Sequence, residues 1–238
     1  MRNKETYVQR LFSSIADRYD TLNTLLSLNR DKYWRRFAVS KAGLNSGEKV
    51  LDVATGTGKL ALELADKVGG RGEVIGIDFC PKMLEKAKEN LREAGCQNIA
   101  LIQANAKALP FQDCIFDCAA NGFGLRNVAD IEQTLQEMTR VLRQGGKLIC
   151  LEFGLPQNRI FRGIYRLYLF GLVPLVGGLL SRNWHAYIYL PRSIAEFPSP
   201  LELRELMEKT GLRNTVVYPL TLGTVTVHVG TKKPGDDS

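Results

Sequence analysis

Short apolar runs alternate with amphipathic stretches through the middle of the chain. Each short, mostly apolar run predicts a buried strand, and each stretch with apolar residues at helical spacing predicts a helix. Strands are expected at 49–54, 73–78, 99–103, 115–120 and 147–153, and helices at 60–68, 81–94 and 130–142. This alternation with short connections predicts an α/β fold with a doubly wound, mostly parallel sheet covered by helices.

The two ends of the chain depart from this repeating middle. Near the N-terminus, Phe12, Ile15 and Tyr19 have helical spacing and predict a helical region. Near the C-terminus a further helix and a hairpin at the sheet edge are expected, which brings the sheet to seven strands. The helix is expected at 201–210 and the hairpin strands at 214–219 and 224–231.

These elements divide the chain into three parts. An N-terminal helical lid spans 1–46, and the main domain spans 47–233. The main domain contains an apolar helical insert at 155–195, and residues 234–238 are expected to be a frayed tail.

Composition fits an ordinary globular protein, with 45% hydrophobic and 24% charged residues. It excludes a disordered chain, a collagen-like repeat and a small disulfide scaffold. The five cysteines have no zinc-ligand spacing, so we expect reduced thiols and no metal site. The N-terminus has no apolar signal segment, so we expect a cytoplasmic protein.

A glycine-rich loop follows the first predicted strand and opens a helix. The loop contains Gly56 and Gly58, whose backbone amides can approach a polar cofactor closely because glycine has no Cβ. Asp78 ends the second strand, where a carboxylate can accept both hydroxyls of a ribose. The loop and the acid predict an adenosine-containing cofactor, either a nicotinamide dinucleotide or S-adenosylmethionine.

Three features favour S-adenosylmethionine. Asp52 lies inside the first strand, where an acid can face the methionine ammonium; capping of the strand end is the alternative. Asn105 and Ala106 follow the third strand, where a polar side chain can bond the adenine edge. The terminal strand pair is the usual way in which a methyltransferase sheet gains its antiparallel edge.

Several separate motifs then resemble one family, the ubiquinone/menaquinone biosynthesis C-methyltransferases. They occur in the family's order from about residue 8 to 232. Two departures are Leu22 in place of a usual Met and Asp31 in place of a usual His. The motifs are the segment 19–27 with Trp34, Phe123-Gly124-Leu125-Arg126-Asn127, the segment 140–153, Tyr187 to Ile194, and Gly223 to Gly230.

The resemblance implies a class I, Rossmann-like fold and a set of cofactor contacts. These contacts are Thr57, Asp78, Asn105, Ala106 and a position after the fourth strand. The last position is usually Ser and is Gly122 here, so only its backbone can contribute. Its neighbour Asn121 is a candidate substitute.

The resemblance also implies methyl transfer from S-adenosylmethionine to a ring carbon of a prenylated quinol. We expect 2-demethylmenaquinol as the substrate, with a benzoquinol of the ubiquinone pathway or another small molecule as alternatives. A cofactor-binding protein without activity is a further alternative. An RNA methyltransferase is disfavoured because neither a catalytic Cys motif nor an Asn-Pro-Pro-aromatic motif is present, and no nucleic-acid partner is expected.

Catalytic candidates follow from the reaction and from the fold. Arg126 is expected to stabilise a phenolate or to position a water, because a guanidinium stays charged and is a poor base. Asn127 would orient the same group. Tyr19 and Asp20 would reach the site from the N-terminal lid; the alternative is that they only cap and pack its helix. His228, on the last strand, faces either the pocket or the sheet interior.

The apolar insert and the net charge point to one further partner. The net charge of +7 lies mostly outside the near-neutral residues 51–150. Residues 159–192 hold five arginines and no acidic residue, and Pro174 and two glycines interrupt the run, which disfavours a transmembrane helix. The insert is expected either to be a buried cap or to touch an anionic membrane as a lid for the prenyl tail. A homodimer is left open.

Overall fold

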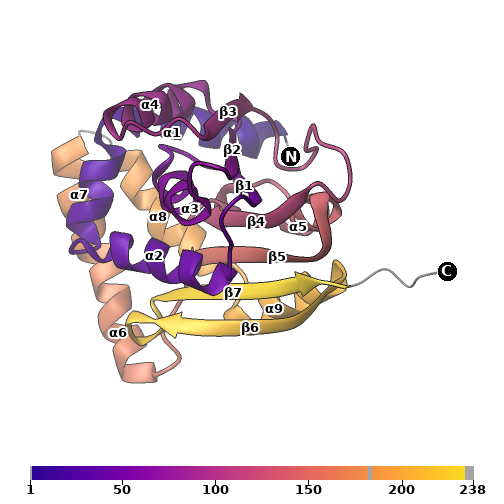
Figure 1. Ribbon diagram of the computed structural model, residues 1–238. Helices are drawn as coiled ribbons and strands as arrows, with labels where there is room; N and C mark the ends of the chain where they lie inside the picture. The colour runs from indigo at the N-terminus through magenta and orange to yellow at the C-terminus, as the bar shows by residue number, and fades with distance from the viewer. Residues whose placement is uncertain (1, 182–183, 234–238) are drawn as a thin grey trace.

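The computed structural model describes residues 2–181 and 184–233. Arg182, one of the five arginines of the insert, and the expected tail 234–238 lie outside the described residues. The chain forms a sheet with helices on both faces and a group of helices at one end (Figure 1).

A seven-stranded sheet with the order β3-β2-β1-β4-β5-β7-β6 forms the centre of the fold. The pairs from β3 through β5 are parallel, whereas β7 is antiparallel to both of its neighbours. This order confirms the predicted doubly wound, mostly parallel sheet. The strands are β1 (Lys49–Val53), β2 (Glu73–Asp78), β3 (Ile99–Gln103), β4 (Phe116–Gly122), β5 (Leu142–Phe153), β6 (Leu212–Leu220) and β7 (Val225–Lys232).

Helices α2 and α3 lie in front of the sheet in Figure 1, and α5 and α9 cover its other face. Helix α4 packs on β2 and β3, and α1 runs beside α4. The bounds are α1 (Arg2–Leu26), α2 (Arg30–Ala42), α3 (Lys59–Val68), α4 (Pro81–Glu93), α5 (Ile131–Val141) and α9 (Pro200–Lys209).

Local signals in the sequence explain where several helices begin. Asp130 accepts a hydrogen bond from the Gln133 amide at the start of α5. Ser199 and Glu202 form a capping box at the start of α9, which satisfies two backbone amides that the helix itself leaves unpaired. Pro81 opens α4 at a position where its missing N–H costs nothing.

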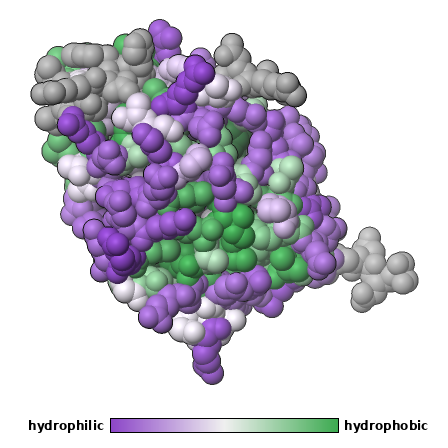
Figure 2. Space-filling view, turned by 90° about the horizontal axis from the view of Figure 1, so that it is seen from above, coloured by the Kyte–Doolittle hydropathy of each residue, from purple (hydrophilic) through white to green (hydrophobic). Residues whose placement is uncertain are grey.

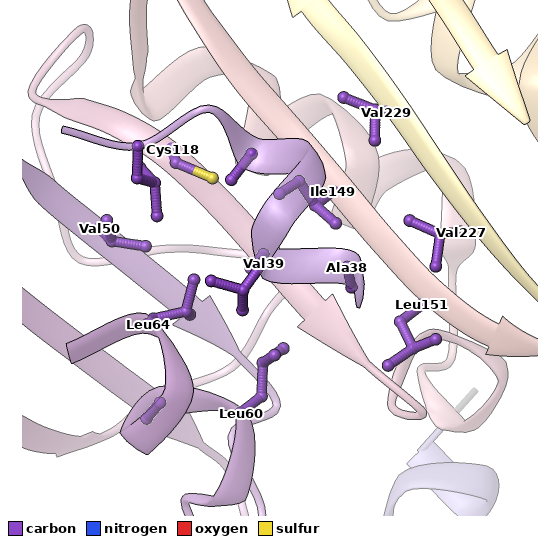
Figure 3. Close-up of a cluster of buried hydrophobic side chains, with 14 of the residues drawn as sticks. Ala38, Val39, Val50, Leu60, Leu64, Cys118, Ile149, Leu151, Val227 and Val229 are labelled. Carbon is purple, nitrogen blue, oxygen red and sulfur yellow. The ribbon is translucent and has the colours of Figure 1, made fainter. Parts of the chain in front are cut away.

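Successive strand residues point to opposite faces and so build two apolar cores. Val50 packs with α2 and α3, whereas Leu51, the next residue, packs with α5 and α9. Figure 3 shows Val39 of α2 and Leu64 of α3 directed at the strands of the first core. Both faces of the sheet are therefore packed against helices, which fixes the positions of the strand ends.

Two strands, β5 and β6, begin earlier than predicted, and the other bounds differ from the prediction by at most two residues. β5 begins at Leu142 rather than at 147, directly after α5, because Leu142 pairs with Phe116 before a register shift restores the regular ladder. β6 begins at Leu212, and a short 3₁₀ turn at Thr221–Gly223 joins it to β7. The hairpin at the sheet edge is confirmed.

The apolar insert folds as helices at one end of the sheet, on the left in Figure 1. It comprises α6 (Arg159–Leu167), a π-helical turn at Tyr168–Leu172, α7 (Val173–Ser181) and α8 (Trp184–Glu196). Leu169 and Val173 pack with Leu11 and Ile15 of α1 in a third core. Among the described residues, no helix is both long enough and apolar enough to cross a membrane.

The outer surface is largely polar on the face seen from above. Figure 2 shows hydrophilic side chains around one continuous hydrophobic area in the middle of that face. Most large apolar side chains of the sheet are instead buried in the cores described above.

The first core should carry a large share of the stability. Leu64 is fully buried between α3 and the sheet, so Leu64→Ala is expected to lower the free energy of unfolding by about 2–5 kcal/mol through lost burial and a cavity. Denaturant unfolding followed by circular dichroism measures this. Leu201→Ala, at a side chain that is 61% exposed, is the matched control and should change stability by less than about 1 kcal/mol.

Candidate active site at the carboxyl ends of the strands

A cavity of about 510 Å³ lies where the carboxyl ends of β1, β2 and β4 meet. Helices α1 and α2 complete its wall with Tyr19, Asp20 and Arg35. Ten of the sequence-predicted site residues line it. They are Tyr19, Asp20, Asp52, Gly56, Thr57, Asp78, Asn105, Ala106, Gly122 and Asn127.

The glycine loop between β1 and α3 turns tightly beneath this cavity. Gly56 and Gly58 have positive φ angles of 55° and 78°, which glycine adopts without strain. A Cβ at Gly58 would lie 2.9 Å from Leu91 Cδ1, so glycine also lets α3 and α4 approach each other. Gly58 supports the loop but is not among the residues that line the cavity.

Asp78 connects the glycine loop to the end of β2. Its carboxylate accepts hydrogen bonds from the backbone amides of Gly56 and Cys80, each at 2.9 Å. Burial raises the pKa of Asp78 to about 6 despite these bonds. The carboxylate is therefore fixed at the cavity wall, where it can accept ribose hydroxyls.

Asp52 is the most deeply buried acid of the site. Its Oδ2 accepts a 2.6 Å hydrogen bond from Thr55, whereas its Oδ1 has no partner among the described residues. Burial raises the pKa of Asp52 to about 7. An unpartnered buried oxygen at a cavity wall is suited to accept from a cation such as an ammonium group.

The loops after β3 and β4 complete the cofactor side. Asn105 lines the cavity and its Oδ1 accepts from the Lys107 amide at 3.0 Å. Asn121 is buried and supports the loop, because its Nδ2 donates to the Val53 carbonyl at 2.7 Å and its Oδ1 accepts from the Leu125 amide at 2.9 Å. A Cβ at Gly122 would lie 3.0 Å from Leu60 Cδ2, so glycine leaves room for Leu60 at this wall.

Asp20 joins the N-terminal helix to the glycine loop. Its carboxylate accepts from Thr57 Oγ1 at 2.6 Å and from Asn90 Nδ2 at 3.0 Å. Lys59 Nζ lies 3.6 Å from the same group. Tyr19, one residue earlier, lines the cavity, and burial raises its pKa while the charge of Arg126 opposes this.

Arg126 lies just behind the cavity wall rather than in it. Its guanidinium forms a 2.6 Å ion pair with Glu152, and its side chain is only 4% exposed. Its Nε is buried without a partner among the described residues, and the Phe153 ring lies 5.2 Å away. Asn127, in the next position, does line the cavity and accepts a 3.1 Å hydrogen bond from the Tyr189 hydroxyl.

His228 lies on β7, away from the residues that line the cavity. Its Nε2 is 2.9 Å from the Pro200 carbonyl, at the start of α9. Burial lowers its pKa. Of the two alternatives for this residue, the structure places it in the sheet interior against α9.

Several site residues did not emerge from the sequence, and four of them carry charge or contact a predicted residue. Glu5, Lys32 and Arg35 line the cavity, and Tyr189 contacts Asn127. The only sequence signal for Arg35 is its spacing of four residues from Asp31, which places both on one side of a helix. Tyr189 belongs to a matched motif, but the motif alone gives it no task.

Solved structures show the same fold. A methyltransferase from Thermotoga maritima matches with a TM-score of 0.67 at 22% identity, covering 95% of this chain and all of that one. A methyltransferase from Aquifex aeolicus matches with a TM-score of 0.62 at 18% identity, covering 89% and 97%. Both are described as dependent on S-adenosylmethionine. These likenesses show a class I, Rossmann-like fold, and the cavity lies at the edge of the sheet where that fold binds its ligands.

Sequence comparisons then place the chain within that class. A model of the ubiE/COQ5 methyltransferase family matches residues 1–232. A ubiquinone/menaquinone biosynthesis C-methyltransferase UbiE of Citrifermentans bemidjiense is 44% identical over 233 residues, 98% of this chain and 99% of that one. A demethylmenaquinone methyltransferase of Bacillus cytotoxicus is 40% identical over 231 residues, 97% and 98% of the two chains. The chain belongs to the ubiE/COQ5 methyltransferase family, and it is an S-adenosylmethionine-dependent C-methyltransferase.

The residues around the cavity fit this cofactor. Asp78 and the glycine loop can hold the ribose, Asn105 and Ala106 the adenine, and Asp52 the ammonium group. A bound ammonium group would supply the hydrogen bond that Asp52 Oδ1 lacks among the described residues.

Asp52 should trade stability for cofactor binding. Its pKa is about 7 in the folded protein against an ordinary 3.8, so its contribution to stability is lost as the pH rises from 3.8 through 7. Asp52→Asn should therefore raise the free energy of unfolding at pH 8, by up to about 4 kcal/mol. It should also weaken S-adenosylhomocysteine binding about tenfold, because a hydrogen-bonded charge partner of the ammonium is lost. Denaturant unfolding and titration calorimetry measure the two effects, and a loss of both stability and affinity would contradict the assignment.

Proposed function

We propose that the protein methylates a ring carbon of a prenylated quinol, converting 2-demethylmenaquinol to menaquinol. The observation that carries this proposal is the buried Arg126 guanidinium set among tyrosines directly behind the cavity wall. The names of the relatives support a quinone substrate, because they include both demethylmenaquinone and ubiquinone/menaquinone methyltransferases.

The reaction sets two requirements for the protein. When bound, the cofactor would supply a methyl group on a positively charged sulfur: a ring carbon would gain the methyl as the sulfur–methyl bond breaks to leave a neutral thioether, and would then lose its proton. The ring must be held so that its carbon faces the methyl group, since alignment can supply several kcal/mol of the barrier. The charge of a ring oxygen that loses its proton must also be stabilised, because a phenolate makes the ring more nucleophilic.

Arg126 brings a positive charge to this wall, beside the negative charge of Glu152. Burial raises the pKa values of Tyr19 and Tyr189; the charge of Arg126 lowers both, whereas the charge of Glu152 raises both to a smaller extent. A quinol hydroxyl is a phenol like these side chains, so the same charge would favour its ionised form at the same place. Glu152 orients the guanidinium through Nη1, which leaves Nε free as a donor.

The neighbouring side chains would orient the ring. Asn127 lines the cavity and is held by the Tyr189 hydroxyl and by a 3.3 Å bond from its own amide to the Phe123 carbonyl. Phe123 has a positive φ of 59°, a strained conformation that directs it to the cavity wall. Tyr19 approaches from α1, and Asp20 fixes that helix over the site. We infer that residues 1–46 act as a lid.

The substrate assignment is tested by comparing two quinols. Purified protein with S-adenosylmethionine and chemically reduced demethylmenaquinone should form menaquinol, detected by mass spectrometry, with a kcat/KM at least about tenfold higher than for the ubiquinone-pathway benzoquinol, a difference of about 1.4 kcal/mol. Higher turnover of the benzoquinol would reverse the substrate preference. Binding of S-adenosylhomocysteine without methylation of either quinol would contradict a quinone substrate.

The same assay tests Arg126 if the ion pair is removed as a unit. Arg126→Ala alone would leave Glu152 buried and unpaired, at a cost of about 3–5 kcal/mol. The double variant Arg126→Gln/Glu152→Gln avoids that charge. It should bind S-adenosylhomocysteine normally and lose about 10²–10³ in kcat. Unchanged turnover would exclude a role for Arg126 in the reaction.

We propose that the protein takes its quinol from a membrane surface, and the exposed side chains of the insert support this. Ile160, Ile164 and Leu167 form the α6 apolar face, and they are 78%, 59% and 76% exposed. Arg159 and Arg166 are exposed on the same helix. No acidic residue occurs between Glu152 and Glu196 in the sequence. Exposed apolar side chains beside arginines suit an anionic lipid surface, so we propose an anionic membrane as the partner of this face.

Vesicle binding tests the α6 apolar face. The protein should cosediment with vesicles of phosphatidylglycerol and phosphatidylcholine, and Ile160→Ser/Ile164→Ser/Leu167→Ser should reduce the partition coefficient at least about tenfold, because less apolar area enters the lipid. Leu201→Ser, on α9 and 61% exposed, is the matched control for the single variant Leu167→Ser. Equal loss in both single variants, or no binding by the wild type, would contradict a membrane role for α6.

A further inference from the structure

Arg35 brings a second positive charge to the cofactor cavity, and the cofactor contacts described above give it no ligand. It lies on α2 and lines the cavity, and its side chain is 12% exposed. Its Nη2 forms a 2.8 Å ion pair with Asp31 Oδ2. Its Nε is buried and has no partner among the described residues.

Asp31 holds this guanidinium in one orientation. The Ser27 hydroxyl donates to Asp31 Oδ1 at 3.1 Å, and the Asp31 amide lies 3.3 Å from Ser27 Oγ. One carboxylate oxygen is thus tied to the start of α2 and the other to Arg35. A guanidinium has five N–H donors in one rigid plane, so the bond from Nη2 to Asp31 fixes that plane while the Nε N–H remains for a second anion.

The neighbours of Arg35 on α2 contact elements that border the cavity. Trp34, next to Arg35, packs its ring 6.1 Å from the Phe123 ring in the loop after β4. Arg36, on the other side, contacts Glu63 of α3 at 3.3 Å. Arg35 therefore lies between α3, the helix that the glycine loop opens, and the loop after β4. Asp52 lines the same cavity from β1, the strand between β2 and β4.

The charges of the ligand indicate what Arg35 binds. The methionine half of S-adenosylmethionine carries an ammonium group and a carboxylate on one carbon. Asp52 offers an unpartnered acceptor for the ammonium, and Arg35 offers an unpartnered donor for an anion. A buried donor without a partner costs about 1–3 kcal/mol, which a bound carboxylate would recover.

The other cations of the cavity are less suited to this task. Lys59 is 39% exposed and lies 3.6 Å from Asp20, and Lys32 is exposed. Solvent weakens the attraction of an exposed ammonium for a carboxylate. Among the lining cations, Arg35 combines burial, fixed orientation and a free donor.

We propose that Arg35, positioned by Asp31, binds the carboxylate of the methionine half of the cofactor. This inference rests on the cofactor and not on the quinol substrate. It assigns Arg35 as a binding residue and Asp31 as a positioning residue that acts through it.

Two ligands that differ in the amino-acid part test the proposal by calorimetry. S-adenosylhomocysteine has the carboxylate, whereas 5′-methylthioadenosine lacks the whole amino-acid group. Arg35→Gln should raise the Kd of S-adenosylhomocysteine about 10- to 100-fold, as expected for a lost charge-assisted hydrogen bond. The Kd of 5′-methylthioadenosine should change by less than about twofold.

Three further variants make the outcome decisive. Arg36→Gln, the adjacent cation paired with Glu63, is the matched control and should leave both Kd values unchanged. Arg35→Lys should recover part of the affinity. Asp31→Asn/Arg35→Gln removes the charge left by the single variant and should show the same selective loss if the single variant folds poorly.

Three outcomes would overturn the proposal. Equal weakening of both ligands would make Arg35 a structural residue. No weakening of S-adenosylhomocysteine would place its carboxylate elsewhere. If the wild type bound neither ligand, the cofactor assignment itself would fail, whereas lack of quinol methylation with normal ligand binding would contradict only the proposed substrate.

Discussion

The carboxylate of Asp20 connects the three elements on which the site depends. It accepts from Thr57 of the glycine loop and from Asn90 of α4, and Asn90 also donates to the Thr57 carbonyl at 2.8 Å. Through this one group, α1 is fixed to the loop that would hold the cofactor. Further contacts run along the same helix: Glu5 pairs with Lys107 at 2.8 Å, and Gln9 donates to the Phe79 carbonyl at 3.3 Å. Helix α1 is thus tied to the loops after β1, β2 and β3.

The buried charges around the cavity show what function costs the fold. Asp52 and Asp78 have raised pKa values because burial disfavours their ionised forms. The pair of Arg126 and Glu152 is buried as well, and such pairs seldom add net stability compared with apolar side chains. These groups lie near the carboxyl ends of β1, β2, β4 and β5, and the two apolar cores on either side of the sheet hold that edge in place. Burial of apolar side chains in the cores offsets the free-energy cost of the buried charges at this edge.

The sequence predicted the sheet and most of the cofactor side. Asp52 and Asp78 lie in strands with clear apolar runs, Gly56 follows the first of them, and parallel strands bring their carboxyl ends to one edge. Long-range pairing was beyond sequence reasoning. Arg126 and Glu152 are 26 positions apart and meet only because β4 and β5 are neighbours. The bounds of β5 were missed for a similar reason, since tertiary pairing with β4 determines where that strand begins.

The apolar insert was visible in the sequence, but the division of its apolar residues was not. Leu169 and Val173 turn inward to pack on α1, whereas the α6 apolar face stays exposed. Helical spacing alone cannot separate these sets, because nearly every position of the run is apolar.

Helix α1 links the cofactor side to the insert because its two sides make different contacts. Its polar side chains contact the loops of the cofactor cavity, and its apolar side chains pack against the insert in the third core. The Tyr168 hydroxyl of the insert also donates to the Leu26 carbonyl at 2.5 Å, at the end of α1. If the insert moved toward lipid, its contacts with α1 would move that helix, and the hydrogen bond from Thr57 to Asp20 would pass the movement to the glycine loop. In this arrangement the surface that would collect an apolar substrate and the loop that would hold the methyl donor share one helix. No further element is needed to connect the two, because one helix buries its apolar side chains against the insert and pairs its polar side chains with the cofactor loops.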